Sequence, residues 1–206
     1  DGRLLHEKNH GISRYTAESL HYLKNYPVQL NIYATCALGK IQFQKDNISL
    51  KTLNLQSRLF RMIWSQTLLP YWVQQDSLDV FWSPTHRLPA FLPSSVARVV
   101  TIHDLVWKHE GKTMRPLSRF MESILMPQAI KNSDLIVVVS KSTAKDIRET
   151  YPKASNKIRV VYPRLSTLLS GENKLNPLVS SPYILFVGTL EPRKNLYRLM
   201  KAFSIL

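Results

Sequence analysis

Short apolar segments alternate along the chain with segments whose apolar residues recur at helical spacing. Residues 134–140 are the clearest apolar segment, because Asp-Leu-Ile-Val-Val-Val-Ser without polar alternation is typical of a strand buried on both faces. Residues 12–23 are the clearest helical pattern, with Tyr15, Leu20 and Leu23 on a shared face. Strands are predicted at residues 28–33, 48–53, 79–82, 98–103, 135–140 and 158–162.

Helical patterns separate most of these strands. They cover residues 12–23, roughly 58–73, 117–130 and 142–151. Because strands that alternate with helices form parallel sheets, we expect an α/β fold with helices on both faces of a parallel sheet. A hydrophobic content of 44% and a charged content of 20% in 206 residues are typical of a globular protein with a substantial core.

The pattern changes character between residues 164 and 182. This stretch contains Gly171 and two prolines and keeps no period, so it is predicted to be a linker between a domain at 1–163 and the start of a second domain at 183–206. One strand and the beginning of one helix cannot form a domain, and the chain opens at Asp1 without a methionine. We therefore expect a fragment cut at both ends.

Residues 183–195 have the composition of a phosphate site. An apolar strand at 183–187 is followed by Gly188, which lets a backbone approach a ligand, and by Asn195, which is expected to cap a helix. Arg193 and Lys194 would then lie beside helix N-terminal amides, where an anion is favoured. An ordinary strand-to-helix connection with solvated charges explains this segment about equally well.

The net charge of +14 favours anionic partners such as phosphates, anionic lipid or nucleic acid. Nucleic acid is the least favoured of these, because neither a zinc-finger spacing nor an aromatic RNA-binding motif occurs. A single cysteine, Cys36, excludes an internal disulfide and fits a reducing compartment. Without a signal peptide or an apolar run of membrane-spanning length, a soluble cytoplasmic protein is expected.

Six short motifs follow one another along nearly the whole chain. They are GISRY at 11–15, WSP at 82–84, VTIHDL at 100–105, IVVVSKST at 136–143, KIRVVYP at 157–163 and GTLEPRKN at 188–195. In this order and spacing they resemble the family-four retaining glycosyltransferases. The resemblance implies the GT-B architecture, in which two Rossmann-like domains face each other across a cleft and hold the acceptor and the nucleotide-sugar donor. This chain would be the N-terminal, acceptor-side domain, the linker and the start of the donor domain.

The resemblance also implies a catalytic pair. His103 follows a predicted strand, at the edge where open α/β sheets bind ligands, and would contact the donor sugar. Asp104 would fix the His103 ring by a hydrogen bond. Retaining members of the family are thought to use front-face departure and attack, so no carboxylate is expected to act as a nucleophile. The donor would be a GDP- or UDP-sugar, with mannose slightly favoured by the resemblance.

Four further residues are expected to bind the donor. By resemblance, Arg193 and Lys194 would hold its diphosphate. Gly188 and Gly11 would allow close approach of backbone to the phosphates, although Gly11 is about equally explained as a turn glycine. No Asp-x-Asp pair occurs, which predicts chemistry without a metal or other cofactor. In the family, the Glu-x7-Glu pair lies in the donor domain, so this polypeptide alone is expected to be inactive.

The acceptor is less defined by the sequence. Residues 58–72 combine cations with bulky apolar side chains, as an interfacial helix does, but a core helix is the preferred interpretation because the apolar positions nearly surround the axis. Lys108, Lys112, Arg115 and Arg119 are the better candidates for docking on anionic lipid. A glycan or lipid-linked acceptor and peripheral membrane contact follow from the resemblance. The alternative function is a non-catalytic module that binds a membrane, an anionic glycan or a partner protein.

Overall fold

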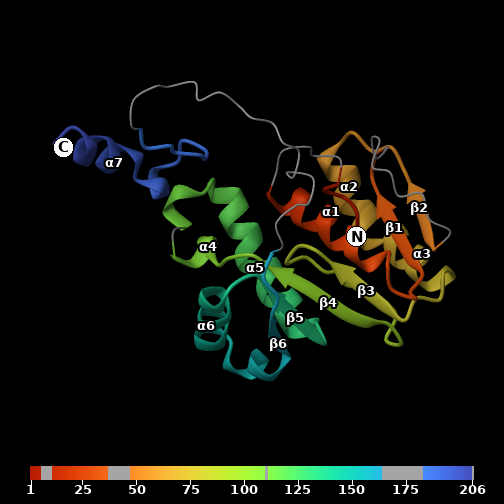
Figure 1. Cartoon of the computed structure of the whole chain (residues 1–206). Coiled ribbons are helices and arrows are strands. Elements are labelled where there is room, and N and C mark those ends of the chain that lie inside the picture. Colours follow the sequence, from red (N-terminus) through yellow and green to blue (C-terminus); the bar gives the residue numbers. More distant parts are fainter. Residues whose placement is uncertain (6–10, 37–46, 110, 164–182, 206) are drawn as a thin grey trace.

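The computed structural model describes residues 1–5, 11–36, 47–109, 111–163 and 183–205 (Figure 1). Its strands are β1 (Leu30–Ala34), β2 (Ile48–Thr52), β3 (Val80–Ser83), β4 (Ala97–Ile102), β5 (Leu135–Val138) and β6 (Ile158–Val160). Each of these strands begins within two residues of the start of a predicted strand. The α/β pattern is therefore confirmed for the described residues between 28 and 162.

Every strand pair in the described chain is parallel. β1 pairs with β2, and a second sheet has the order β3-β4-β5-β6. The first residues of the chain join the two sheets: the Asp1 amino group donates to the Trp82 carbonyl oxygen over 2.9 Å, and the Gly2 amide donates to the Tyr33 carbonyl oxygen over 2.7 Å. Because parallel strands all point the same way, their carboxyl ends share one edge, as the predicted fold requires.

Helices cover both faces of the sheets. On β1, Ile32 packs with Leu20 of the helix α1 (Gly11–Leu23), whereas the next residue, Tyr33, packs with Leu69 of the helix α3 (Leu68–Gln75). Successive strand residues point to opposite faces, so the two helices lie on opposite sides. The helices α5 (Pro116–Asn132) and α6 (Lys141–Thr150) pack against β4 and β5 in the largest core cluster.

The predicted helix at 58–73 is two helices. α2 (Arg58–Gln66) ends at Gln66 with Thr67 as its C-cap, and α3 begins at Leu68. Pro70 accounts for the break, because its ring clashes with the carbonyl four residues earlier, at Gln66, in a continuous helix. The core interpretation holds for Trp64 of α2 and for Leu69 and Val73 of α3, but it is wrong for the other large apolar side chains of α2. The exposed residues are Leu59, Phe60, Met62 and Ile63.

The segment 183–205 differs most from expectation. Residues 183–187 do not form the predicted strand, because no described segment pairs with their backbone groups. A 3-10 turn, η4 (Pro192–Lys194), precedes the helix α7 (Leu196–Phe203). Asn195 occupies the N-cap position, but its left-handed backbone (φ 52°) keeps the side chain from making the predicted cap hydrogen bond. The predicted linker at 164–182 lies outside the described residues.

Candidate active site

A cavity of about 680 Å³ lies between α1 and one face of the four-stranded sheet, where Val99 and Val137 line it, and it extends to His103 after the carboxyl end of β4. α1 contributes Gly11, Arg14 and Tyr15 to its wall. The sheet side contributes Trp82 of β3 and His103, which directly follows β4. Parallel α/β sheets bind their ligands at their carboxyl edge, so the end of the cavity at His103 lies where the fold class predicts a site.

The His103 ring is half-buried and held in one orientation. Its Nε2 lies 2.9 Å from the carbonyl oxygen of Pro84, in the loop after β3, and the Tyr15 ring meets it edge-on at 5.2 Å between centroids. Because a carbonyl oxygen only accepts, Nε2 must carry the proton of the neutral ring. Nδ1 is then a hydrogen-bond acceptor, and none of the described residues donates to it.

Burial also sets the charge of this ring. Desolvation lowers the pKa of His103 below its ordinary value of 6.5, and the charge of His86 acts in the same direction. The hydrogen bond to Pro84 and the charge of Asp104 oppose the shift without reversing it. At neutral pH the ring is therefore neutral, which suits orientation of a substrate hydroxyl better than donation of a proton.

Asp104 does not orient His103 as the sequence suggested. Its carboxylate Oδ1 accepts from the Val106 amide over 3.1 Å, at the start of the short helix α4 (Val106–His109). A carboxylate two residues before a helical amide makes this local bond readily, and Pro84 already occupies Nε2 of His103. The predicted Asp104–His103 hydrogen bond is wrong, and Asp104 influences the ring through its charge alone.

A serine between a strand and a helical pattern predicts an N-cap, and Ser140 is the N-cap of α6. Its Oγ accepts from the Thr143 amide over 3.0 Å at the start of α6. The Thr143 hydroxyl in turn donates to the His103 carbonyl oxygen over 3.1 Å. The motif at 136–143 thereby fixes the backbone of His103 from the side of β5.

Gly11 is the exposed first residue of α1. A Cβ at this position would meet no described atom within 4 Å, and the backbone has no positive φ. Neither internal packing nor a left-handed turn therefore requires glycine here, so the turn-glycine explanation is not supported. The open space in front of Gly11 belongs to the same cavity as His103.

The predicted phosphate-binding residues of the C-terminal segment do not line this cavity. Gly188 and Lys194 are exposed, and Gly188 lies next to the Phe186 ring. The Arg193 side chain is outside the described part of the structure. Figure 1 shows α7 beyond α4, away from β1 and β2. Within the described residues, the structure brings together Gly11 and His103 of the predicted site and leaves Gly188 and Lys194 apart.

One polar cluster near His103 was missed by sequence reasoning. Glu122 of α5 is buried and contacts both His86 and Arg87, in the loop after β3. Glu122 could have been noticed in the sequence, because it is the one acidic residue between positions 111 and 133, in an otherwise basic stretch. No group of three or more His, Cys, Asp or Glu within the described ranges is arranged to hold a metal ion.

Comparison with known proteins identifies the family. A model of Glycosyltransferase Family 4 matches residues 9–165, which include α1, the six strands of the described residues and His103. The chain belongs to glycosyltransferase family 4. No curated protein matches it. Family 4 glycosyltransferases transfer sugars, so the cavity between α1 and the sheet edge is a candidate site for sugar donor and acceptor.

Proposed function

We propose that this family 4 domain holds the acceptor side of a retaining glycosyltransferase that uses a nucleotide-activated sugar. The observation that supports it most is the His103 ring, fixed beside Gly11 in one cavity with Nδ1 available as an acceptor. A sugar hydroxyl that donates to Nδ1 would be oriented for departure of the nucleoside diphosphate. GDP-mannose is the first donor to test, and UDP-sugars are the next.

The donor phosphates would lie between two backbone segments. Gly11, at the N-terminus of α1, lines the cavity, and a helix N-terminus favours an anion. Arg193 and Lys194 would supply the cations that stabilise the departing diphosphate, once the segment 183–205 faces the cavity. Because side-chain cations take this role, we propose that transfer needs no divalent metal ion.

A donor screen tests this function. The enzyme is incubated with GDP-mannose or UDP-sugars and a lipid-linked acceptor fraction, with and without EDTA, and the anomeric configuration of the product is determined by NMR. We expect one donor to be consumed with retention at an unchanged rate in EDTA. An inverted product, or activity only with an added divalent ion, would contradict the mechanism proposed here.

We also propose that the acceptor is reached at an anionic membrane surface. No described helix is long and apolar enough to cross a membrane. However, Phe60 and Ile63 of α2 are 59% and 47% exposed, and Phe91 in the loop after β3 is 75% exposed. The Ala90 amide donates to Gln66 Oε1 over 2.8 Å, which joins this loop to α2. These side chains form an apolar surface around the end of α2.

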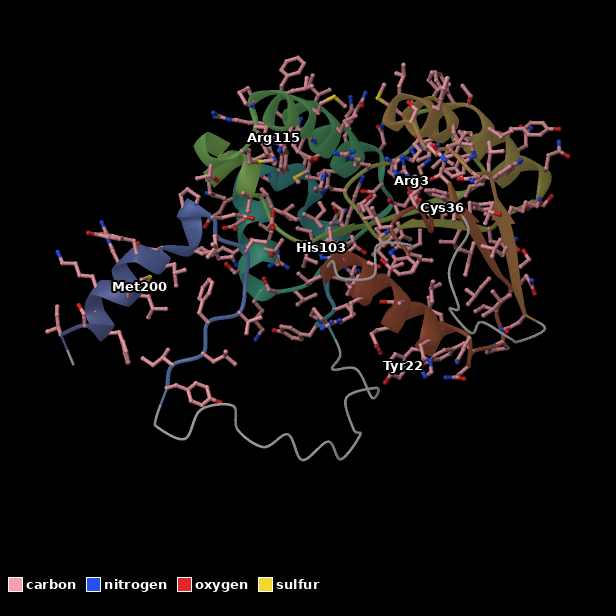
Figure 2. The ribbon with its side chains drawn as sticks, turned by 90° about the horizontal axis from the view of Figure 1, so that it is seen from above. Arg3, Tyr22, Cys36, His103, Arg115 and Met200 are labelled. Carbon is pink, nitrogen blue, oxygen red and sulfur yellow. The ribbon has the colours of Figure 1, made fainter. Side chains whose placement is uncertain are left out.

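The charge of the surrounding segments fits anionic lipid. Residues 47–75, 80–103 and 111–133 contain one acidic residue, Glu122, and it is buried. Arg115, the N-cap of α5, and Arg119 of α5 are exposed, and Phe120 and Ile124, which follow them, are exposed as well. Figure 2 shows the ribbons of α5 and α2 along one side of the molecule, with Arg115 labelled there. Apolar groups flanked by cations are typical of interfacial binding.

Exchange of Phe60 and Ile63 together for serine is expected to weaken binding to phosphatidylglycerol vesicles roughly 10- to 100-fold, because two partly inserted apolar side chains are lost. Sedimentation with vesicles measures the affinity. The control is Tyr26→Ser, because the Tyr26 side chain is 62% exposed. Tyr26 follows Tyr22 by four residues, and Figure 2 shows Tyr22 on the side of the molecule opposite to Arg115. Equal loss in both variants, or no salt-sensitive binding of the parent protein, would exclude this surface.

A further inference from the structure

Glu122 is a buried carboxylate placed between two basic side chains. It lies on α5 at 8% exposure, its Oε1 accepts from Arg87 Nη2 over 2.6 Å, and its Oε2 contacts His86 Nε2. Burial opposes ionisation, but the hydrogen bonds and charges of His86 and Arg87 outweigh it and lower the pKa of Glu122 to about 2. The carboxylate is therefore ionised throughout the neutral range.

Both partners of Glu122 belong to the loop that orients His103. This loop leaves β3 at Ser83, which pairs with Val100 of β4, and reaches His86 three residues later. Between these two anchors lies Pro84, whose carbonyl oxygen accepts from His103 Nε2. The strand pairing fixes one end of the loop and Glu122 fixes the other, so the position of the Pro84 carbonyl depends on both.

We propose that Glu122 is a positioning residue for His103, which it holds in the Nε2-protonated tautomer through the His86–Arg87 loop. The catalytic meaning of this role rests on the proposed function, since it presumes that His103 Nδ1 orients a sugar hydroxyl. Glu122 itself is not among the residues that line the cavity. Its effect reaches the cavity through one loop and one carbonyl oxygen.

Loss of the carboxylate charge has a defined consequence. In a Glu122→Gln variant, Arg87 keeps its place only as a cation without a counter-charge, which is costly in a half-buried site, and His86 loses its carboxylate partner. The loop is then expected to move outward, and the Pro84 carbonyl moves with it. His103 Nε2 loses its fixed acceptor, so the ring is free to change tautomer and orientation.

The test is the ring tautomer of His103, read at neutral pH from the separate 15N shifts of its protonated and unprotonated nitrogens. We expect one tautomer, protonated at Nε2, in the parent protein and a mixture in Glu122→Gln. Glu122→Asp, which keeps the charge, is expected to restore part of the Nε2-protonated population. The control is Glu149→Gln, which removes an exposed i,i+4 partner of Lys145 on α6.

Activity gives the second measurement. With an accepted donor, Glu122→Gln is expected to lower kcat roughly 10- to 100-fold with donor KM little changed, because the ring is misplaced while donor binding persists. If Glu122→Gln does not fold, the tautomer and the activity are measured in Arg87→Gln, because the Arg87 side chain is 39% exposed. An unchanged tautomer in a folded variant overturns the proposal, even if melting temperature falls.

The two measurements separate this inference from the proposed function. A tautomer change without sugar transfer from any donor supports the role of Glu122 and contradicts the proposed reaction. Sugar transfer with retention, together with an unchanged His103 tautomer in Glu122→Gln, supports the reaction and overturns the positioning role. The tautomer measurement needs no substrate, so it can be made first.

Discussion

Replacement of His103 by alanine is expected to lower turnover roughly 100- to 1000-fold with little change in donor affinity. The ring is fixed by Pro84 and Tyr15 with Nδ1 as its remaining acceptor, so its loss removes an oriented contact at the reacting sugar. A preorganised polar contact of this kind acts mainly on the transition state. Steady-state kinetics combined with a direct donor-binding measurement separates the two effects.

Two variants make this result specific. His109→Ala removes an exposed imidazole from α4 and is expected to leave turnover unchanged. His103→Asn keeps one amide donor for the Pro84 carbonyl and one oxygen acceptor for the substrate, so partial recovery is expected. Turnover in His103→Ala equal to that of the parent enzyme would rule out a catalytic role for this ring.

The same ring sets the expected pH dependence. The pKa of His103 is lowered below 6.5, mainly by burial, so the ring is neutral and Nδ1 accepts at all pH values above 6.5. Protonation below that range converts Nδ1 to a donor and abolishes the contact. Activity is therefore expected to be level from about pH 7 upward and to fall in acid, and His103→Asn should remove this acid limb.

Replacement of Gly11 by valine is expected to raise the donor KM or lower kcat, with kcat/KM reduced roughly 100-fold. The new side chain would meet no described atom of the protein, but it would project where the donor phosphates are proposed to approach the start of α1. Steric exclusion of a ligand from helix N-terminal amides weakens both binding and orientation. Donor titration and initial rates provide the measurement.

Folding is the control for this variant. Because the position has a negative φ and open space, Gly11→Val and Gly11→Ala are expected to melt within a few degrees of the parent protein. Gly11→Ala is expected to have an intermediate kinetic effect, in line with its smaller side chain. A large drop in melting temperature would instead place Gly11 in the packing of α1 and leave no role for it at the donor.

Local sequence patterns predicted a secondary-structure element correctly where the partners of its backbone groups were present in the fold. The apolar segment of β5 predicted a central parallel strand, and the serine at 140 predicted the N-cap of α6, because both depend on residues close in sequence. The strand at 183–187 was predicted on the same grounds and did not form among the described residues, since a strand needs a neighbour that sequence pattern alone does not supply.

Exposure was the second quantity that local pattern did not decide. In α2, apolar residues nearly surround the axis, which suggested a core helix, yet Trp64 is buried while Phe60 and Ile63 are exposed. The number of neighbouring elements available to cover a helix is a property of the whole fold. For this reason the apolar surface around α2 emerged only from the structure.

The sequence by itself determined the order of strands and helices, the parallel pairing of the strands and the position of His103 at their carboxyl edge. The periodicity of apolar residues indicates each element, and the alternation of strands with helices indicates parallel pairing. Only the tertiary structure decided what orients that histidine. The Pro84 carbonyl, 19 residues earlier, contacts the His103 ring, and Glu122, 19 residues later, contacts His86 and Arg87 of the loop that contains Pro84. Such contacts depend on how the elements pack, which no local pattern specifies.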